Sequence, residues 1–412
     1  MIPADETLEP TIGILLAAAV IVAQIARRLA LPYTVGLVIC GIALALAHIK
    51  VGATLTHDLI FDAILPPLLF EAAINIRWSE LKRDVVPVLV LAIIGTIVAA
   101  AVVAAGLAGL LHWPVASALA FGALIAATDP VAVIALFKDN RIVGRIRLLV
   151  ESESLFNDGV AAVLFTLVLA WAQAGGGEQG GLGGLAGTLA LTVGGGIGIG
   201  LAVGAAATAV AGRLADDLVE GALTWVTAYG SFLLAERAHA SGVLATVVAG
   251  LVIGNLRILR HAGAAADSAH SRRFVLALWE FIAFVANSII FLLIGMAVAR
   301  IAFRDLGLGA LAEIIGLVLI ARAVTVYPLC FLFRGSDRAI AMRDQHILWW
   351  GGLRGALALA LALALPPGLA LRDEILIAAF AVVTFSVIVQ GVTMPLLLRT
   401  LRLSRASADD DS

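Results

Sequence analysis

The chain is a succession of long apolar stretches separated by short polar breaks. Stretches of about 20 apolar residues suffice to cross a hydrocarbon core about 30 Å thick, and such stretches recur from residue 10 to residue 399. The pattern predicts an all-α membrane protein with about 13 transmembrane helices and no soluble domain. The predicted segments lie at residues 10–26, 32–49, 58–75, 85–111, 115–137, 146–174, 183–212, 218–236, 242–256, 273–299, 308–333, 345–365 and 375–398.

Composition agrees with this pattern. Of the 412 residues, 62% are hydrophobic and 14% are charged, whereas soluble domains average about 25% charged residues. Met1 to Pro10 carry acids but no Lys or Arg, so they lack the basic region of a cleavable signal peptide, and we expect the first helix to be retained. Cys40 and Cys330 lie inside apolar segments, which favours core packing over a disulfide or a metal site.

The positions of Lys and Arg predict an orientation. With the N-terminus outside, most of the 27 basic residues fall in cytoplasmic loops, as the positive-inside rule requires. We therefore expect a multi-pass protein of the cell (inner) membrane with a cytoplasmic C-terminus. Residues 1–403 form the predicted transmembrane domain, with one repeat at about 32–174 and a second at about 242–400, and residues 404–412 form a short cytoplasmic tail. The Gly-rich stretch 175–184 is the predicted outside loop between the halves.

Six charged residues lie deep within the apolar segments. Each costs about 2.5–3.5 kcal/mol at the bilayer centre, so we expect them to face one another or a wet cavity. Four acids against two bases leave an interior short of positive charge, which favours uptake of protons or small cations. Any one of them could instead belong to a structural ion pair between helices. The six are Glu71, Asp129, Glu153, Asp158, Arg322 and Arg354.

Segment 115–137 contains Thr128-Asp129-Pro130 near its middle. Proline lacks an N–H and clashes with the carbonyl four residues earlier, so we expect the helix to break there. Non-helical backbone at membrane depth is tolerated where it lines a cavity or is buried in protein, and discontinuous helices are typical of transporter sites. A simple proline kink is the alternative.

Segment 146–174 carries Glu153, Ser154, Asn157 and Asp158. Residues four apart share a helix face, so Ser154 lies over Asp158 and Glu153 over Asn157. The first face offers the hard oxygen ligands that hard cations prefer. The second could hold a structural pair, for which Glu153 with Arg322 is our candidate. Glu151 is interpreted as a solvated charge outside the site.

Segment 345–365 contains Gly351, Gly352 and Gly355 around Arg354. The glycines permit an unwound stretch, although close helix packing is the alternative. Segments 115–137 and 345–365 run in opposite directions, as an inverted repeat of broken helices requires.

Segment 58–75 places Glu71 one turn after a double proline. Glu71 could be a cation ligand reached through water, or a gate residue. Asp62, Glu280 and Glu313 are interpreted as interface or helix-end charges.

These motifs together resemble the monovalent cation/proton antiporters, in particular sodium/proton exchangers of the NhaP type. The resemblance covers residues 31–400. It implies a homodimer in which each protomer has a dimerisation domain and a core domain with two crossing discontinuous helices. The matching stretches are Leu65-Pro66-Pro67 with Phe70-Glu71-Ala72, Thr128 to Val133, Glu153-Ser154 with Asn157-Asp158-Gly159, Arg322, and Gly351 to Ala356.

The resemblance also implies roles for individual residues. Cation and proton binding falls to Asp158 and Asp129 with Ser154, the Thr128 carbonyl and Glu71. Glu153 and Arg322 are implied as a structural pair, and Asn157 and Arg354 as support for the site. Asn157 before Asp158 implies electroneutral exchange of one cation per proton. Many relatives have a long cytoplasmic regulatory tail, which this sequence almost lacks.

The predicted function is exchange of Na⁺ for H⁺ by alternating access, with Li⁺ or K⁺ as alternative cations and with cation and proton competing for buried carboxylates. A K⁺-preferring antiporter and a proton-independent cation channel are the alternatives. The chain contains no G-x-S-x-G and no H-E-x-x-H, the signatures of two hydrolase classes, and we expect no enzyme activity. We also expect no cofactor beyond the transported ions and no nucleic-acid partner.

Overall fold

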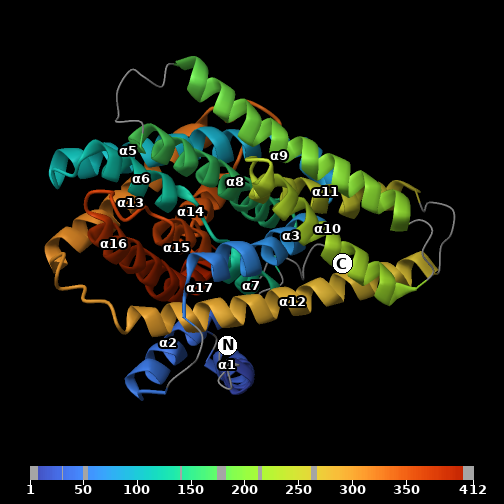
Figure 1. The fold of residues 1–412 in the computed structure, drawn as a ribbon, viewed down its shortest axis with the longest axis horizontal. Helices are drawn as coiled ribbons and strands as arrows, with labels where there is room; N and C mark the ends of the chain where they lie inside the picture. Colours follow the sequence, from blue (N-terminus) through green and yellow to red (C-terminus); the bar gives the residue numbers. More distant parts are fainter. Residues whose placement is uncertain are drawn as a thin grey trace, which may run out of the picture.

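The computed structural model describes residues 8–29, 31–49, 54–139, 142–173, 182–211, 216–260 and 267–401 and folds them almost entirely into helices (Figure 1). The helices of the first part are α1 Leu8–Leu29, α2 Tyr33–Leu46, the π-helix η1 Leu59–Ile64, α3 Leu65–Asn75, α4 Trp78–Leu89, the π-helix η2 Val90–Gly95, α5 Thr96–Leu110, α6 Val115–Ala126, α7 Val131–Asp139 and α8 Arg145–Gln173. Those of the second part are α9 Leu182–Ala211, α10 Asp217–Arg237, α11 Gly242–Arg260, α12 Asp267–Val298, α13 Leu308–Phe331, α14 Met342–Trp350, α15 Ala356–Leu363, α16 Arg372–Phe385, the π-helix η3 Ser386–Gln390 and α17 Gly391–Thr400.

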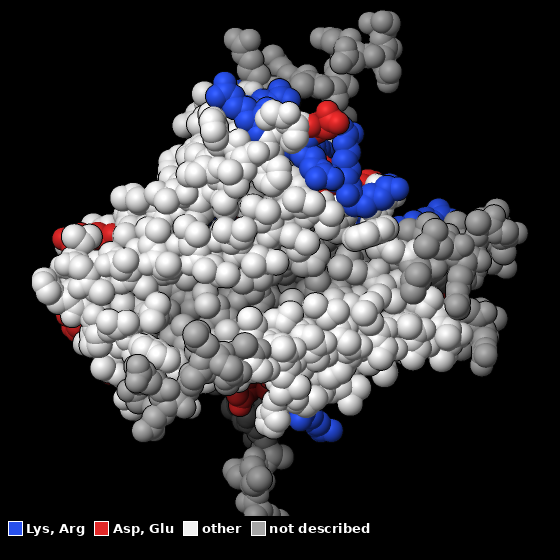
Figure 2. Space-filling model, turned by 90° about the horizontal axis from the view of Figure 1, so that it is seen from above, with Lys and Arg blue, Asp and Glu red and all other residues white. Residues whose placement is uncertain are grey.

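The prediction of an all-α membrane protein is confirmed. Among the described residues, seven helical spans are long and apolar enough to cross a membrane, and four shorter apolar helices accompany them. Each predicted segment overlaps one to three consecutive helices. Figure 2 shows a broad uncharged surface, with most of the visible Lys and Arg along one edge of the molecule and a smaller group at the opposite edge. That distribution suits a protein surrounded by lipid.

The predicted Gly-rich loop is shorter than expected, because α9 already begins at Leu182 and includes Gly183 and Gly184. Glycines are tolerated in membrane helices, where they permit close packing. Residues 175–181 and the predicted tail at 404–412 lie outside the described residues.

The helices pack in two groups, which lie on different sides in Figure 1. In the first group, α9, α10 and α3 pack on α11, while α2 and α3 pack on α12. In the second group, α5 packs on α6 and α13, α6 on α8, and α15 on α16. We call α1–α3 with η1 and α9–α12 the first helix group, and α4–α8 with η2, and α13–α17 with η3, the second helix group.

Glycines allow the closest approach within the first group. A Cβ at Gly41 on α2 would overlap the Leu292 carbonyl of α12, and one at Gly295 on α12 would overlap the Val38 carbonyl of α2. The two backbones therefore touch at a place where any side chain would separate them. This contact fixes α12 along one side of the cavity described below.

Two helices of the second group are interrupted at the middle of the molecule, as the sequence predicts. One interruption separates α6 from α7 at residues 127–130, and the other separates α14 from α15 at residues 351–355. The two extended stretches cross and form an isolated antiparallel bridge, in which the Asp129 N–H donates to the Leu353 carbonyl at 2.7 Å. A backbone N–H of the first break and a backbone carbonyl of the second thus satisfy each other's hydrogen bonding.

Candidate functional site

The break between α6 and α7 fixes the Asp129 carboxylate. Pro130 has no N–H to continue the helix, and α7 begins at Val131, whose N–H donates to Asp129 Oδ1 at 2.9 Å. Asp129 therefore caps the N-terminus of α7, where the helix dipole favours a negative group. Its second carboxylate oxygen makes no hydrogen bond to another described residue and stays available for a ligand.

Helix α8 holds Thr128 by four hydrogen bonds. Ser154 Oγ donates to the Thr128 carbonyl at 2.5 Å and lies 2.7 Å from Thr128 Oγ1. Asn157 accepts from the Thr128 N–H at 3.1 Å and donates to Thr128 Oγ1 at 2.6 Å. All three residues are buried. The break is therefore a defined extended stretch rather than a loose hinge.

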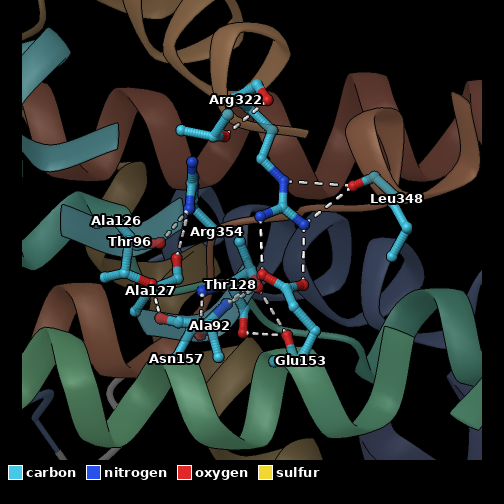
Figure 3. Close-up of polar contacts among 12 residues, drawn as sticks. Ala92, Thr96, Ala126, Ala127, Thr128, Glu153, Asn157, Arg322, Leu348 and Arg354 are labelled. Atoms are coloured by element: carbon cyan, nitrogen blue, oxygen red, sulfur yellow. Dashed lines mark hydrogen bonds and ion pairs between the residues drawn. The ribbon is translucent and has the colours of Figure 1, made fainter. Parts of the chain in front are cut away.

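Two buried arginines neutralise the carbonyl ends of the interrupted helices (Figure 3). Arg354 donates to the carbonyls of Ala126 and Ala127, at 2.7 and 2.8 Å, where α6 ends. Arg322 donates to the carbonyl of Leu348, near the end of α14, at 3.0 Å. A positive group favours the negative end of a helix dipole, so each arginine stabilises one broken helix.

Glu153 forms the pair with Arg322 that the sequence analysis expects. The contact is bidentate, at 2.8 and 2.9 Å, and both side chains are buried. Asn157 donates to the same carboxylate at 3.1 Å. Glu153 is therefore fully engaged by Arg322 and Asn157.

Three of the expected ligand carboxylates meet at one cavity. A cavity of about 720 Å³ is lined by Glu71, Asp129 and Asp158, together with Thr128 and Gly355. Asp129 and Asp158 are only partly buried, as groups open to a cavity are. Glu71 accepts a hydrogen bond from Asn75 at 2.9 Å. Ser154 does not line the cavity, and its hydroxyl is turned to Thr128.

Glycines in the second break make room for the charged groups. A Cβ on Gly355 would overlap the carboxylate of Asp129, and a Cβ on Gly352 would lie 2.6 Å from Arg322 Nε. A Cβ on Gly351 would lie 2.6 Å from the Ile347 carbonyl. The sequence predicts an unwound stretch at these glycines. The structure adds that Gly352 and Gly355 leave space for Arg322 and Asp129.

Two acids that the sequence places outside the site line the cavity. Glu151 lines the cavity together with Leu155 and Asp158, which follow it on the same face of α8, and its carboxylate lies 3.6 Å from Arg147 Nε. Spacing of four and seven residues on one helix was the signal that could have placed it. Glu280, expected to be an interface or a helix-end charge, is an interface charge: it lines the cavity from the middle of α12, which runs from Asp267 to Val298, and pairs with Lys138 of α7.

A further ion pair, between buried Asp84 and partly exposed Arg145, is not predicted from the sequence. Asp84 on α4 accepts from Arg145 at the start of α8 at 2.7 and 3.0 Å. Arg145 also donates to the carbonyls of Arg338 and Ala339 before α14. Asp84 lies in the polar stretch before segment 85–111. No apolar periodicity in that stretch indicates that its side chain is buried. The pair fastens three parts of the second helix group together, away from the cavity.

Fold and site together define a class: a polytopic membrane carrier with two crossed discontinuous helices and a carboxylate-lined cavity at their crossing. The chain belongs to the sodium/hydrogen exchanger family, because residues 14–400 match the family described as "Sodium/hydrogen exchanger, transmembrane".

Individual relatives agree with this assignment. The Na⁺/H⁺ antiporter ApNhaP of Aphanothece halophytica is 40% identical over 374 residues, covering 90% of this chain and 70% of that protein. The Na⁺/H⁺ antiporter NhaH of Halobacillus dabanensis is 33% identical over 407 residues, covering 94% of this chain and 96% of that protein. The fold is similar to that of the sodium proton antiporter MjNhaP1 from Methanocaldococcus jannaschii, with a TM-score of 0.75 at 20% identity, covering 95% of this chain and 97% of that chain.

Proposed function

We propose that the chain exchanges Na⁺ for H⁺ across the inner membrane. One observation carries the proposal. Glu71, Asp129 and Asp158 line one cavity, while the two buried arginines beside it are engaged with Glu153 and with backbone carbonyls. Arg322 is therefore balanced by Glu153, and the single charge of Arg354 cannot balance three cavity carboxylates, so a small cation or protons can supply the missing positive charge. Relatives that carry the name Na⁺/H⁺ antiporter support the same conclusion.

The proposed ligands follow from the cavity. Asp158 and Asp129 bind either Na⁺ or H⁺, and Glu71 assists from α3 through water. The Thr128 carbonyl is the backbone ligand, and Ser154 holds that carbonyl in place or turns to the ion itself. Glu153, Arg322, Asn157 and Arg354 keep the two broken helices in register, and Pro130, Gly351, Gly352 and Gly355 permit the breaks.

Exchange follows from competition for the carboxylates. An uncompensated charge is costly to carry through a low-dielectric passage, so only a site neutralised by Na⁺ or by protons changes sides. Na⁺ bound on one side then has to be replaced by H⁺ before the site returns. Alternating access of a single site at the repeat interface provides the required coupling.

The two helix groups fit this mechanism as two bodies. The cavity lies between them, with α3 and α12 on one side and both helix breaks with α8 on the other. We propose that the first group is the dimerisation domain of a homodimer, and that the second is the core domain that carries the site. Lys138, Arg147 and Arg273 line the cavity, and the predicted orientation places these residues at the cytoplasmic side, so this conformation is open to the cytoplasm.

Reconstituted protein tests the function. In proteoliposomes, the wild type is expected to move H⁺ in response to a Na⁺ gradient, and Asp158→Asn is expected to abolish this exchange because an amide neither binds nor releases the proton. Full exchange by Asp158→Asn would refute the site assignment. Arg343→Gln, which removes an exposed charge at the start of α14, is the control. It is expected to keep wild-type exchange, so that a loss in Asp158→Asn is not due to purification or reconstitution.

The same preparation separates the alternatives. Electroneutral exchange is expected to be insensitive to an imposed membrane potential. Substitution of K⁺ or Li⁺ for Na⁺ ranks the cations and would reveal a K⁺-preferring antiporter. Na⁺ flux that neither requires nor moves protons would instead identify a channel.

A further inference from the structure

The mouth of the cavity carries a mixed set of charges that the transport mechanism does not use. Lys138 at the end of α7, Arg147 and Glu151 at the start of α8, and Arg273 and Glu280 on α12 all line it. Glu71 belongs to the same lining. Any ion that enters from this side passes these side chains before it reaches Asp129 and Asp158.

Two ion pairs connect the mouth charges. Lys138 Nζ lies 2.8 Å from Glu280 Oε1, and the pair joins the second helix group to the first across the opening. Arg147 Nε lies 3.6 Å from Glu151 Oε2 on the same helix. The side chains of Lys138 and Glu280 are 49% and 66% exposed. Exposed pairs of this kind contribute little to stability, so this pair holds the two helix groups together only weakly.

We expect these charges to act on an entering ion through their electrostatic potential rather than through their ion pairs. A cavity with low-dielectric walls focuses the potential of charges at its opening, which changes the local concentration of an entering ion. An acid at the mouth raises the local Na⁺ concentration, and a base lowers it.

We propose that the mouth charges set the apparent affinity for Na⁺: Glu151 and Glu280 attract the entering cation, while Lys138 and Arg147 repel it. The proposal rests on the proposed function, because it assigns to these residues a quantitative role in the same transport. They are positioning residues for the ion and touch neither Asp129 nor Asp158 in the described hydrogen bonds and ion pairs.

A structural latch is the rival explanation for the Lys138–Glu280 pair. If the pair acted by holding α7 against α12, then loss of either partner would break the same contact. Lys138→Gln and Glu280→Gln would then change the apparent affinity in the same direction. The field mechanism predicts opposite directions, because the two substitutions remove charges of opposite sign.

The test measures the Michaelis constant for Na⁺ in proteoliposomes at pH 8 for both variants and for Glu151→Gln. Glu280→Gln and Glu151→Gln are expected to raise the constant about two- to fivefold, and Lys138→Gln to lower it by a similar factor. Maximal rates are expected to stay near the wild-type value. All shifts are expected to shrink when choline chloride raises the ionic strength, because salt screens partly exposed charges.

Arg77→Gln and Glu80→Gln are the matched controls. These residues form an ion pair at 3.3 Å with side chains 60% and 54% exposed, away from the cavity lining, and neither substitution is expected to change the constant. Shifts of the same sign for Lys138→Gln and Glu280→Gln, or no shift in either, would overturn the proposal. Equilibrium Na⁺ binding to the detergent-solubilised variants is expected to follow the same order. That readout tests the field even if the wild type failed to couple Na⁺ to H⁺, which would refute the proposed function alone.

Discussion

At the scale of single residues, both polar atoms of the Asn157 side chain form hydrogen bonds behind the site. Its amide oxygen accepts from the Thr128 N–H, and its amide nitrogen donates to Thr128 Oγ1 and to Glu153. An amide has both donors and an acceptor, whereas an ionised carboxylate only accepts. An aspartate at this position would face the Glu153 carboxylate without a proton to share, so the local contacts favour asparagine.

Gly355 provides a prediction at the same scale. Its backbone is extended, with φ −138°, so alanine would suit the backbone but its Cβ would overlap the Asp129 carboxylate. Gly355→Ala is therefore expected to displace Asp129 and reduce Na⁺/H⁺ exchange at least tenfold. Gly316→Ala in α13 has open space around its Cβ and is expected to keep wild-type exchange. Equal activities of the two variants in proteoliposomes would contradict the role of Gly355.

At the scale of elements, the interrupted helices depend on charges from other segments. The carbonyl end of α6 is neutralised from the α14–α15 break by Arg354, and that of α14 is neutralised from α13 by Arg322. A helix end inside a membrane has no water to satisfy its carbonyls. The breaks are thus stable only because the two halves of the chain meet.

Arg322→Met tests this dependence. The substitution leaves Glu153 as a buried, uncompensated acid, which is expected to destabilise the protein by about 3–5 kcal/mol. The double substitution Glu153→Leu with Arg322→Met removes the buried charge and is expected to recover much of that loss. Thermal unfolding in detergent measures both effects. A double variant as unstable as Arg322→Met would show that the Arg322 contact to Leu348, rather than the ion pair, dominates.

At the scale of the whole molecule, a cavity of about 720 Å³ lies between the two helix groups. Its lining includes Lys138 and Arg273, whereas the exposed surface between the charged ends is broad and uncharged (Figure 2). With the predicted orientation, we expect this conformation to be accessible from the cytoplasm.

Single cysteines in a background with Cys40 and Cys330 replaced by alanine test this orientation. Asp305→Cys, exposed between α12 and α13, is expected to react with a membrane-impermeant maleimide on intact cells, whereas Ser336→Cys, exposed after α13, is not. Ala277→Cys on the cavity wall is expected to react only in inverted vesicles. Labelling of Ser336→Cys from outside would reverse the orientation.

The sequence by itself determined the helical segments, the break at Pro130 and three of the acids that line the cavity, Glu71, Asp129 and Asp158. Apolar length, a missing proline N–H and the cost of a buried charge are local properties, and each can be evaluated without knowing the fold. They even indicated the Glu153–Arg322 pair, since a charge in a membrane needs a partner.

Only the tertiary structure decided which groups meet. Arg354 against the end of α6, Asp84 against Arg145, Gly355 against Asp129, and Glu280 opposite Lys138 all join segments far apart in the chain. Residues of one helix share a face at a fixed spacing, so periodicity can find them. Contacts between helices depend on crossing points and rotations that many residues set together, and no single segment encodes them.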